Sequence, residues 1–490
     1  MLALELKHLE RELERLCDLA RSMGLDFFDM RFEVCPPEVL HAFGAYGMPT
    51  RYSHWSFGKS YQKIKTRYDY NLLRIYEMVV NCDPCYAFLL EGNSLIQNVA
   101  VAAHVLAHSD FFKHNRAFAR TSRHMLDTMA SNAERIRAYE FRHGRQAVES
   151  FLDAVLSIQE QVDAHRPARP VPVPRGPAAR EASVHGRGSG CRDFHRSCSC
   201  GCGPESCRPT PYDDLWNIGV EEGEPLPKPR RVPQEPEKDL LLFLVEHARG
   251  LEDWQRDIIS MVREEMLYFW PQMETKIMNE GWATYWHTRL VRELDLDEAE
   301  ALEFARMQAQ VLQPSRLHLN PYLVGCRIFE HIEKRWDNPT EEERERFGRR
   351  GGEGRGKIFE VREMDTDLSF LRNHLTKELV EELDLYLYRK IGSQWRVVEK
   401  DWEKVRDGIV ASLVNCGYPY IVVEDGDYRG NGELYLKHRY EGLELDLRHL
   451  EKTLRYLHTL WGRTVHLETV TDDRVCRFSF DGSSHHRTFL

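Results

Sequence analysis

Apolar residues recur with a helical period along most of the chain. In residues 1–24, leucines stand three or four positions apart, which is the spacing of one helix face, and the stripe ends at Gly24. Residues 61–165, 238–345 and 365–416 show the same period. The pattern therefore predicts a mainly α-helical protein.

The period changes to two after Pro419. Runs of alternating apolar and polar residues predict short strands, at residues 420–424, 433–437, 464–468 and 475–479. Helical spacing from about Leu445 to Trp461 lies between the second and third of these runs. We expect a large helical domain followed by a small C-terminal α+β domain with antiparallel strand pairing.

A segment rich in proline, glycine and cysteine divides the helical part. Residues 166–235 begin with a proline-rich linker and hold few large apolar side chains, so we expect them to be largely disordered. Five cysteines crowd between Cys191 and Cys207 without the paired spacing of a zinc site, which leaves open incidental metal affinity, structural zinc or a redox role. The expected domains are a helical domain in two parts and a C-terminal domain, at residues 1–165, 236–400 and 401–490.

The composition narrows the class of protein. The 490 residues carry a formal net charge of −11, which argues against a nucleic-acid partner and an anionic membrane surface. No apolar run approaches the roughly 20 residues of a membrane-spanning helix. The first residues are charged and amphipathic, unlike a signal peptide. We therefore expect a cytoplasmic protein without a membrane span.

Residues 270–290 place an acidic side chain in apolar surroundings. Glu280 and His287 are seven residues apart, so on a helix their side chains share a face. A carboxylate among aromatic residues needs a positive partner, because burying it alone is costly. Lys276 or a metal ion would meet that need.

Two histidines earlier in the chain supply the other ligands of such a metal site. His104 and His108 are four residues apart, which puts both imidazoles on one helix face, and their flanks are uncharged. With Glu280 they form the two-histidine, one-carboxylate set of a catalytic zinc site that keeps a position open for water. The same set also suits iron(II).

Several long sequence motifs resemble those of one known family. They are Gly47-Met48-Pro49, His54-Trp55-Ser56-Phe57-Gly58-Lys59, Asn93-Ser94-Leu95, His104 through Phe112, Pro271-Gln272 through His287, and Asn320-Pro321-Tyr322. With these motifs the chain resembles the stage V sporulation protein R family over most of residues 25–470. The resemblance implies a link to the spore cortex, a peptidoglycan layer, and therefore a peptide or peptidoglycan-related substrate.

A shorter sequence motif gives a hint about the mechanism. Asn-Glu-Gly-Trp-Ala, centred on Gly281, is similar to the third-ligand motif of gluzincin metallopeptidases. In that class a His-Glu-x-x-His helix holds the other two ligands and the general base, but here Val105 stands at the position of the base. The resemblance implies a shared ligand geometry with a different proton acceptor.

Other side chains are candidates for the site, and each has a structural alternative. His287 is a fourth metal ligand or a hydrogen-bond partner of Glu280. Glu274, Asp110 and His287, in that order, are the candidate bases. Glu274 otherwise pairs with a basic side chain, and Asp110 otherwise orients an imidazole or caps the surface. Tyr285 would donate to a developing oxyanion or pack in the core.

Three functions are compatible with this predicted site. The first is a zinc-dependent hydrolase of a peptide or amide bond, with zinc polarising the carbonyl and activating water. The second is a non-catalytic regulatory or assembly protein with a structural or vestigial metal site, which Val105 favours. Iron-dependent oxygen chemistry comes last, because nothing else in the sequence supports it. In the second case a protein partner would bind through the C-terminal domain.

Overall fold

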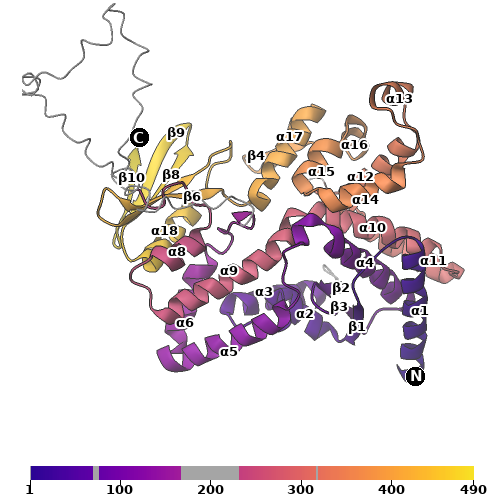
Figure 1. Cartoon of the computed structure of the whole chain (residues 1–490), viewed down its shortest axis with the longest axis horizontal. Helices are drawn as coiled ribbons and strands as arrows, with labels where there is room; N and C mark the ends of the chain where they lie inside the picture. Colours follow the sequence, from indigo (N-terminus) through magenta and orange to yellow (C-terminus); the bar gives the residue numbers. More distant parts are fainter. Residues whose placement is uncertain (1, 70–76, 167–230, 316–317) are drawn as a thin grey trace, which may run out of the picture.

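The computed structural model describes residues 2–69, 77–166, 231–315 and 318–490. Helices dominate these residues, and small sheets complete them (Figure 1). This confirms the predicted class, a mainly α protein with a small C-terminal α+β part. The proline- and cysteine-rich segment falls almost wholly outside the described residues, so its predicted disorder stays a prediction.

The first part of the chain mixes helices with a sheet that the apolar period did not predict. The helices are α1 (Leu2–Ser22), α2 (Pro37–Tyr46), α3 (Trp55–Asp69), α4 (Leu95–His114), the 3-10 helix η1 (Arg116–Phe118), α5 (Met125–His143) and α6 (Arg145–Leu156). The sheet has the order β1-β3-β2, with β1 (Met30–Cys35) parallel to β3 (Cys85–Leu90) and β2 (Glu77–Val80) antiparallel to it. Strand β3 is a short buried apolar run, which periodicity does not distinguish from helix, whereas β1 alternates apolar and charged residues.

Helices follow one another through the middle of the chain. They are α8 (Leu240–His247), α9 (Asp253–Glu274), α10 (Lys276–Arg292), α11 (Glu298–Val311), α12 (Pro321–Asp337), α13 (Glu341–Phe347), α14 (Gly354–Met364), α15 (Asp367–His374) and α16 (Lys377–Glu382). Helices α4, α10 and α12 form the centre of one buried cluster, with α1, α14 and α15 around them. Because α4 and α10 are covered on nearly all sides, their apolar residues run around the whole helix.

The chain between α16 and the last domain holds a hairpin and two helical segments. Strands β4 (Leu387–Ile391) and β5 (Gln394–Glu399) pair antiparallel, and α17 (Trp402–Leu413) and the 3-10 helix η4 (Val414–Gly417) follow. The prediction of continuous helix over residues 365–416 is wrong at this hairpin. Gly392, with a φ of 65°, makes the turn, and the β-branched Val397 and Val398 favour a strand.

The C-terminal sheet has five strands in the order β10-β9-β8-β7-β6. They are β6 (Ile421–Tyr428), β7 (Glu433–His438), β8 (Val465–Thr471), β9 (Arg474–Phe480) and β10 (His485–Phe489), and α18 (Leu447–Trp461) connects β7 to β8. The four predicted strands and the helix are present. The pairing is antiparallel except between β7 and β8, which are parallel because α18 crosses over between them.

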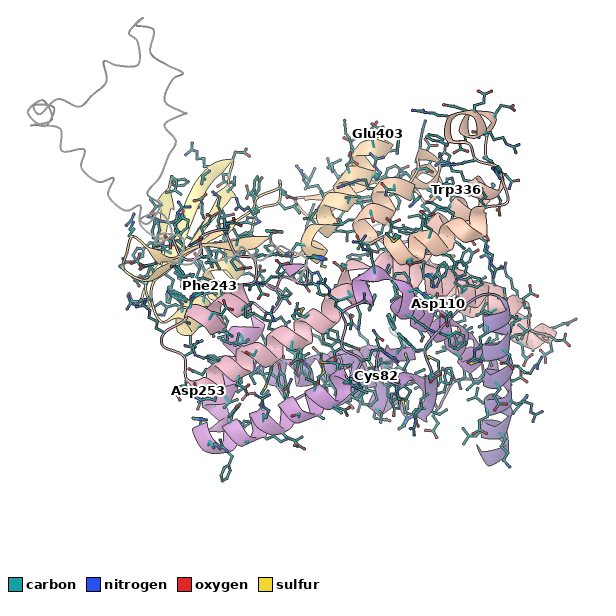
Figure 2. The ribbon with its side chains drawn as sticks, in the orientation of Figure 1. Cys82, Asp110, Phe243, Asp253, Trp336 and Glu403 are labelled. Carbon is teal, nitrogen blue, oxygen red and sulfur yellow. The ribbon has the colours of Figure 1, made fainter. Side chains whose placement is uncertain are left out.

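The C-terminal sheet shares its core with helices from the earlier part of the chain. A second buried cluster joins residues of α5, α6, α8 and α9 to α18 and the sheet. Figure 2 shows Phe243 of α8 at this contact, where its ring stacks on Trp461 with centroids 5.7 Å apart. The predicted domain boundaries stay predictions, since this core crosses them. In the described part of the chain, no helix combines the length and apolar character needed to cross a membrane.

Candidate metal centre

Helix α4 presents two imidazoles in the middle of the larger core. Ser94 caps its first turn, because the Ser94 side chain accepts from the Gln97 N–H while the Gln97 side chain accepts from the Ser94 N–H. Ten residues on, His104 and His108 are each 4% exposed. Their spacing of four places both rings on the face toward α10, as predicted.

Helix α10 supplies the carboxylate. The helical conformation is interrupted between α9 and α10 at Thr275. The Asp367 carboxylate accepts from the backbone N–H groups of Ile277 and Met278 at 2.8 and 2.9 Å. This cap fixes the first turn of α10 against α15. Glu280 follows one turn later, on the side toward α4.

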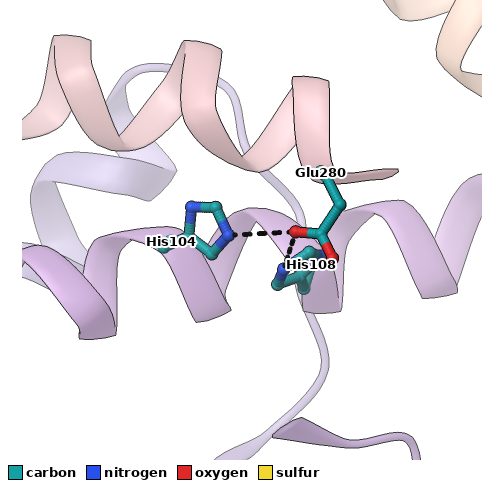
Figure 3. Close-up of side chains that lie close together, drawn as sticks. All are labelled: His104, His108 and Glu280. Atoms are coloured by element: carbon teal, nitrogen blue, oxygen red, sulfur yellow. Dashed lines mark ion pairs between the residues drawn. The ribbon is translucent and has the colours of Figure 1, made fainter. Parts of the chain in front are cut away.

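The three side chains converge across the contact between these helices (Figure 3). Nε2 of His104 and Nε2 of His108 each lie 3.5 Å from the same oxygen of Glu280, Oε2. The ligand atoms of all three residues lie within 4.8 Å of one another. Lys276, the alternative partner of Glu280, is exposed on the first turn of α10.

A hydrogen bond from Asn279 fixes the tautomer of His108. The distance from His108 Nδ1 to Asn279 Oδ1 is 2.8 Å. A carbonyl oxygen only accepts, so Nδ1 carries the proton and donates it. Nε2 of His108 therefore presents a lone pair toward Glu280.

A longer chain of hydrogen bonds fixes the tautomer of His104. The Thr288 hydroxyl donates to the Thr284 carbonyl, so Thr288 Oγ1 accepts from Gln308 Nε2 at 2.8 Å. The Gln308 oxygen then accepts from His287 Nε2 at 2.5 Å. Because this places the proton of a neutral His287 on Nε2, its Nδ1 accepts from His104 Nδ1 at 2.8 Å. His104 is left with a lone pair on Nε2, also directed toward Glu280.

Glu280 is an ionised carboxylate that needs positive charge beside it. Burial by itself raises the pKa of Glu280, but the imidazoles of His104 and His108 outweigh it and hold the pKa well below its ordinary value. Burial lowers the pKa of His287 to about 3, so this ring is neutral near pH 7. Neutral His104 and His108 would present only lone pairs to Glu280, so the positive charge that keeps this carboxylate ionised is a proton or a metal ion on their Nε2 atoms.

This donor set fits a divalent transition-metal ion. Zinc bonds to imidazole nitrogen and carboxylate oxygen at about 2.0–2.2 Å, so two ligands of a tetrahedral site lie about 3.4 Å apart. The two nitrogen–oxygen distances of 3.5 Å match that separation and are too long for direct hydrogen bonds. His104, His108 and Glu280 would hold the ion, and Asn279 and His287 would orient the two rings.

His287 lies beside the cluster but is not directed at it. Both of its ring nitrogens are hydrogen bonded, one to His104 and the other to Gln308. The prediction of a fourth ligand is therefore corrected: His287 supports His104. The predicted alternative, a hydrogen bond to Glu280, is absent as well, because the His287 partner is His104.

The structure places the predicted bases elsewhere. Asp110, labelled in Figure 2, is fully buried, and its carboxylate accepts from the Asp26 N–H, the Trp282 indole and Arg362. Glu274, at the end of α9, pairs with His165 at 3.3 Å. Neither carboxylate joins the cluster, which in the described ranges contains no acidic group other than Glu280.

Tyr285 is also directed away from the cluster. Its ring lies under the Arg289 guanidinium, 3.5 Å from the centroid, and beside Trp286 in the core. The tyrosine next to the site is Tyr322 of α12, whose ring stacks on His104 with centroids 5.9 Å apart. Tyr322 belongs to the motif Asn320-Pro321-Tyr322, but nothing in the sequence spacing indicated that its ring contacts His104.

Two supporting residues were missed by the sequence analysis. Asn279 precedes Glu280 in the Asn-Glu-Gly motif, and the amide was an available signal for a hydrogen-bonding partner. Gln308 lies in α11, and only the packing of α11 against α4 brings the Gln308 side chain to His287.

Comparisons with known proteins agree with the resemblance seen in the sequence. Residues 3–418 match the family described as SpoVR like protein, and residues 419–472 match the SpoVR-like C-terminal domain. A curated relative, the uncharacterized protein YcgB of Escherichia coli strain K12, is 28% identical over 494 residues, which cover 94% of this chain and 91% of the relative. No solved structure matches the chain. None of these findings carries the gluzincin resemblance, which stays a prediction.

Proposed function

We propose, from the premise that this chain belongs to the SpoVR-like protein family, that it is a metal-dependent hydrolase of a peptide or amide bond. Family membership supports a sporulation-associated protein. The link of that family to the spore cortex makes a peptidoglycan-related peptide the substrate class. A cytoplasmic location would favour a precursor, or a protein substrate, over finished cell wall.

One observation carries the proposal. Two imidazoles whose tautomers are fixed by hydrogen bonds present their lone pairs to one oxygen of an ionised Glu280, at 3.5 Å each. A zinc ion held there would polarise a carbonyl group and make bound water acidic. The chain itself contributes orientation through Asn279 and His287. The buried faces of α4 and α10 around the site limit the access of bulk water.

Tyr322 is our candidate for the side chain that would act on a substrate beside the ion. It is half-buried, and its ring lies against His104 on the side of α12. A phenol in this place donates a hydrogen bond to an oxygen that gains negative charge. Tyr322 thus takes the role that the sequence suggested for Tyr285.

A second function is favoured by a specific absence. Val105, at the position of the gluzincin base, is fully buried, and Asp110 and Glu274 are bound elsewhere. Among the described residues, no second carboxylate joins the three ligands. A non-catalytic assembly or regulatory protein, with the ion tying α4 to α10, needs no such base.

Hydrolysis of a defined substrate separates the two functions. The purified protein, loaded with zinc, is incubated with a peptidoglycan stem peptide, and products are followed by mass spectrometry. We expect cleavage by the native chain and by Glu274→Gln, which removes a carboxylate outside the cluster, but not by Glu280→Gln. A protein that binds zinc and cleaves no stem peptide or amide would support the assembly function instead.

A further inference from the structure

The hairpin β4–β5 stands apart from the rest of the fold. Its two strands pair with each other and with no other strand in the part of the chain that the structure describes. Leu387, at its base, packs against the larger core, but every residue from Arg389 to Val398 is exposed. A two-stranded hairpin with no covered face is marginally stable in water, because it needs a third strand or a packed face.

Large apolar side chains occupy this bare hairpin. Trp395 is 53% exposed and Ile391 51%, and Val397 and Val398 are also open to solvent. Side chains that alternate along a strand and lie opposite each other across the ladder share a face, so Trp395 and Val397 lie on one face and Ile391 on the other. Both faces thus expose apolar area that a bound chain would cover.

The hairpin is also basic on an acidic protein. Arg389 and Arg396 lie directly opposite each other in the ladder, an arrangement that is destabilising when like charges meet without a counter-ion. Neither forms an ion pair with an acidic side chain among the described residues. Between residues 387 and 400 there are four basic residues and one acidic residue, whereas the whole chain has a net charge of −11.

We propose that the β4–β5 hairpin is the docking site for an acidic, extended segment of a partner protein. The segment adds as a third strand to one open edge, where unpaired backbone N–H and C=O groups match those of another strand. Its carboxylates bind the Arg389–Arg396 pair, which presents two guanidinium groups on one face. Its apolar residues cover Trp395 or Ile391.

The charges of the hairpin distinguish this partner from two others. A second copy of the chain would bring an identical basic strand alongside, and its arginines would repel the first pair. A nucleic acid would neutralise the arginines, but its long run of phosphates would be repelled by a chain whose net charge is −11. Nucleic acid would also leave the strand edge unpaired. A short acidic strand would pair with the edge, neutralise the arginines and cover an apolar face.

Binding of a labelled peptide to the full chain tests the proposal. The probe is a fluorescein-labelled peptide of alternating glutamate and valine, followed by fluorescence anisotropy, with a lysine–valine peptide and an oligothymidylate for comparison. We expect the acidic peptide to bind most tightly. R389Q/R396Q should weaken it by about tenfold or more, because two charge-assisted hydrogen bonds are lost. A peptide with alternate backbone nitrogens methylated should bind as weakly, since it no longer pairs with the strand edge.

A matched variant controls for net charge. R15Q/R346Q removes two arginines whose side chains are 58% and 70% exposed elsewhere on the surface, and its affinity should equal that of the native chain. Circular dichroism confirms that both variants are folded. Equal loss in both variants, no binding of the acidic peptide, or tighter binding of oligothymidylate would overturn the proposal. So would a dimer that R389Q/R396Q dissociates, because it would show a second copy in this place.

Discussion

Gly281 of α10 and Gly325 of α12 touch backbone to backbone. A Cβ atom added at Gly281 would lie 2.4 Å from the Gly325 Cα, and one added at Gly325 would lie 2.2 Å from the Ile277 carbonyl oxygen. Only glycine allows so close a crossing of two helices. Since Glu280 precedes Gly281, this crossing sets how far the carboxylate reaches toward α4.

Replacing either glycine should therefore disturb both stability and the site. Gly281→Ala forces α10 away from α12, and we expect a loss of about 1–3 kcal/mol in the free energy of unfolding together with weaker metal binding. Gly356→Ala is the control, because that glycine lies in α14 with nothing within 4 Å of an added Cβ. It should leave stability unchanged or raise it by about 0.5–1 kcal/mol. Urea unfolding measures both, and an equal effect of the two changes would contradict this account.

Gln308 should control the metal affinity without touching the ion. Gln308→Leu removes the acceptor for His287 Nε2, so His287 and then His104 lose their fixed tautomers. We expect a fall of about 10–100-fold in zinc affinity, the usual effect of removing a supporting partner. Gln308→Glu keeps an acceptor and should restore most of it. Competition with a zinc chelator measures the affinities, and equal values for both variants would refute the role of this chain of hydrogen bonds.

Asp110 should matter for stability and not for the metal. Its carboxylate is fully buried and paired with Arg362, and removing one partner of such a pair costs about 3–5 kcal/mol. We expect Asp110→Ala to lower the melting temperature strongly while the folded fraction keeps its zinc content. A variant that folds normally but binds zinc weakly would restore the predicted role of Asp110 as a support for the ligands.

Asp367 should make the protein less stable as the pH rises toward neutrality. Burial raises the pKa of Asp367 to about 7, although the N–H groups of Ile277 and Met278 oppose the shift. Between about pH 4 and 7 the folded protein then holds a proton that the unfolded chain has released. Stability therefore falls with rising pH across that window, by at most about 1.4 kcal/mol per pH unit from this group. Asp367→Asn should remove this part of the slope in unfolding measured at several pH values. An unchanged slope would show that Asp367 stays ionised.

Much of the fold could be predicted from the sequence because apolar residues recur with a clear helical or strand period. The helices of the core and the C-terminal strands follow patterns that burial imposes on one face or on alternate residues. The sheet of β1, β2 and β3 and the β4–β5 hairpin were missed for opposite reasons. In the first, β3 is a short buried apolar run, although the alternation of Met30, Phe32 and Val34 with charged residues in β1 was an available strand signal. The second is exposed on both faces and leaves no alternation to detect.

The candidate site could be predicted only as far as single helices determine it. The spacing of His104 and His108 gives their common face, and the Asn-Glu-Gly motif points to Glu280. The roles assigned to Asp110, Glu274 and Tyr285 depended on which way each side chain is directed after α4, α9 and α10 pack. Helix packing decides this, and sequence spacing contains no measure of it.

We propose above all that His104, His108 and Glu280 bind one metal ion. Elemental analysis of the purified full chain by inductively coupled plasma mass spectrometry tests it most directly, on the native protein and on His104→Ala and Glu280→Gln, with Glu274→Gln as the control. We expect about one equivalent of a divalent transition metal in the native chain and the control, and little in the other two. A folded native protein that neither contains nor takes up zinc, iron or another such metal would contradict it, as would full metal content in Glu280→Gln.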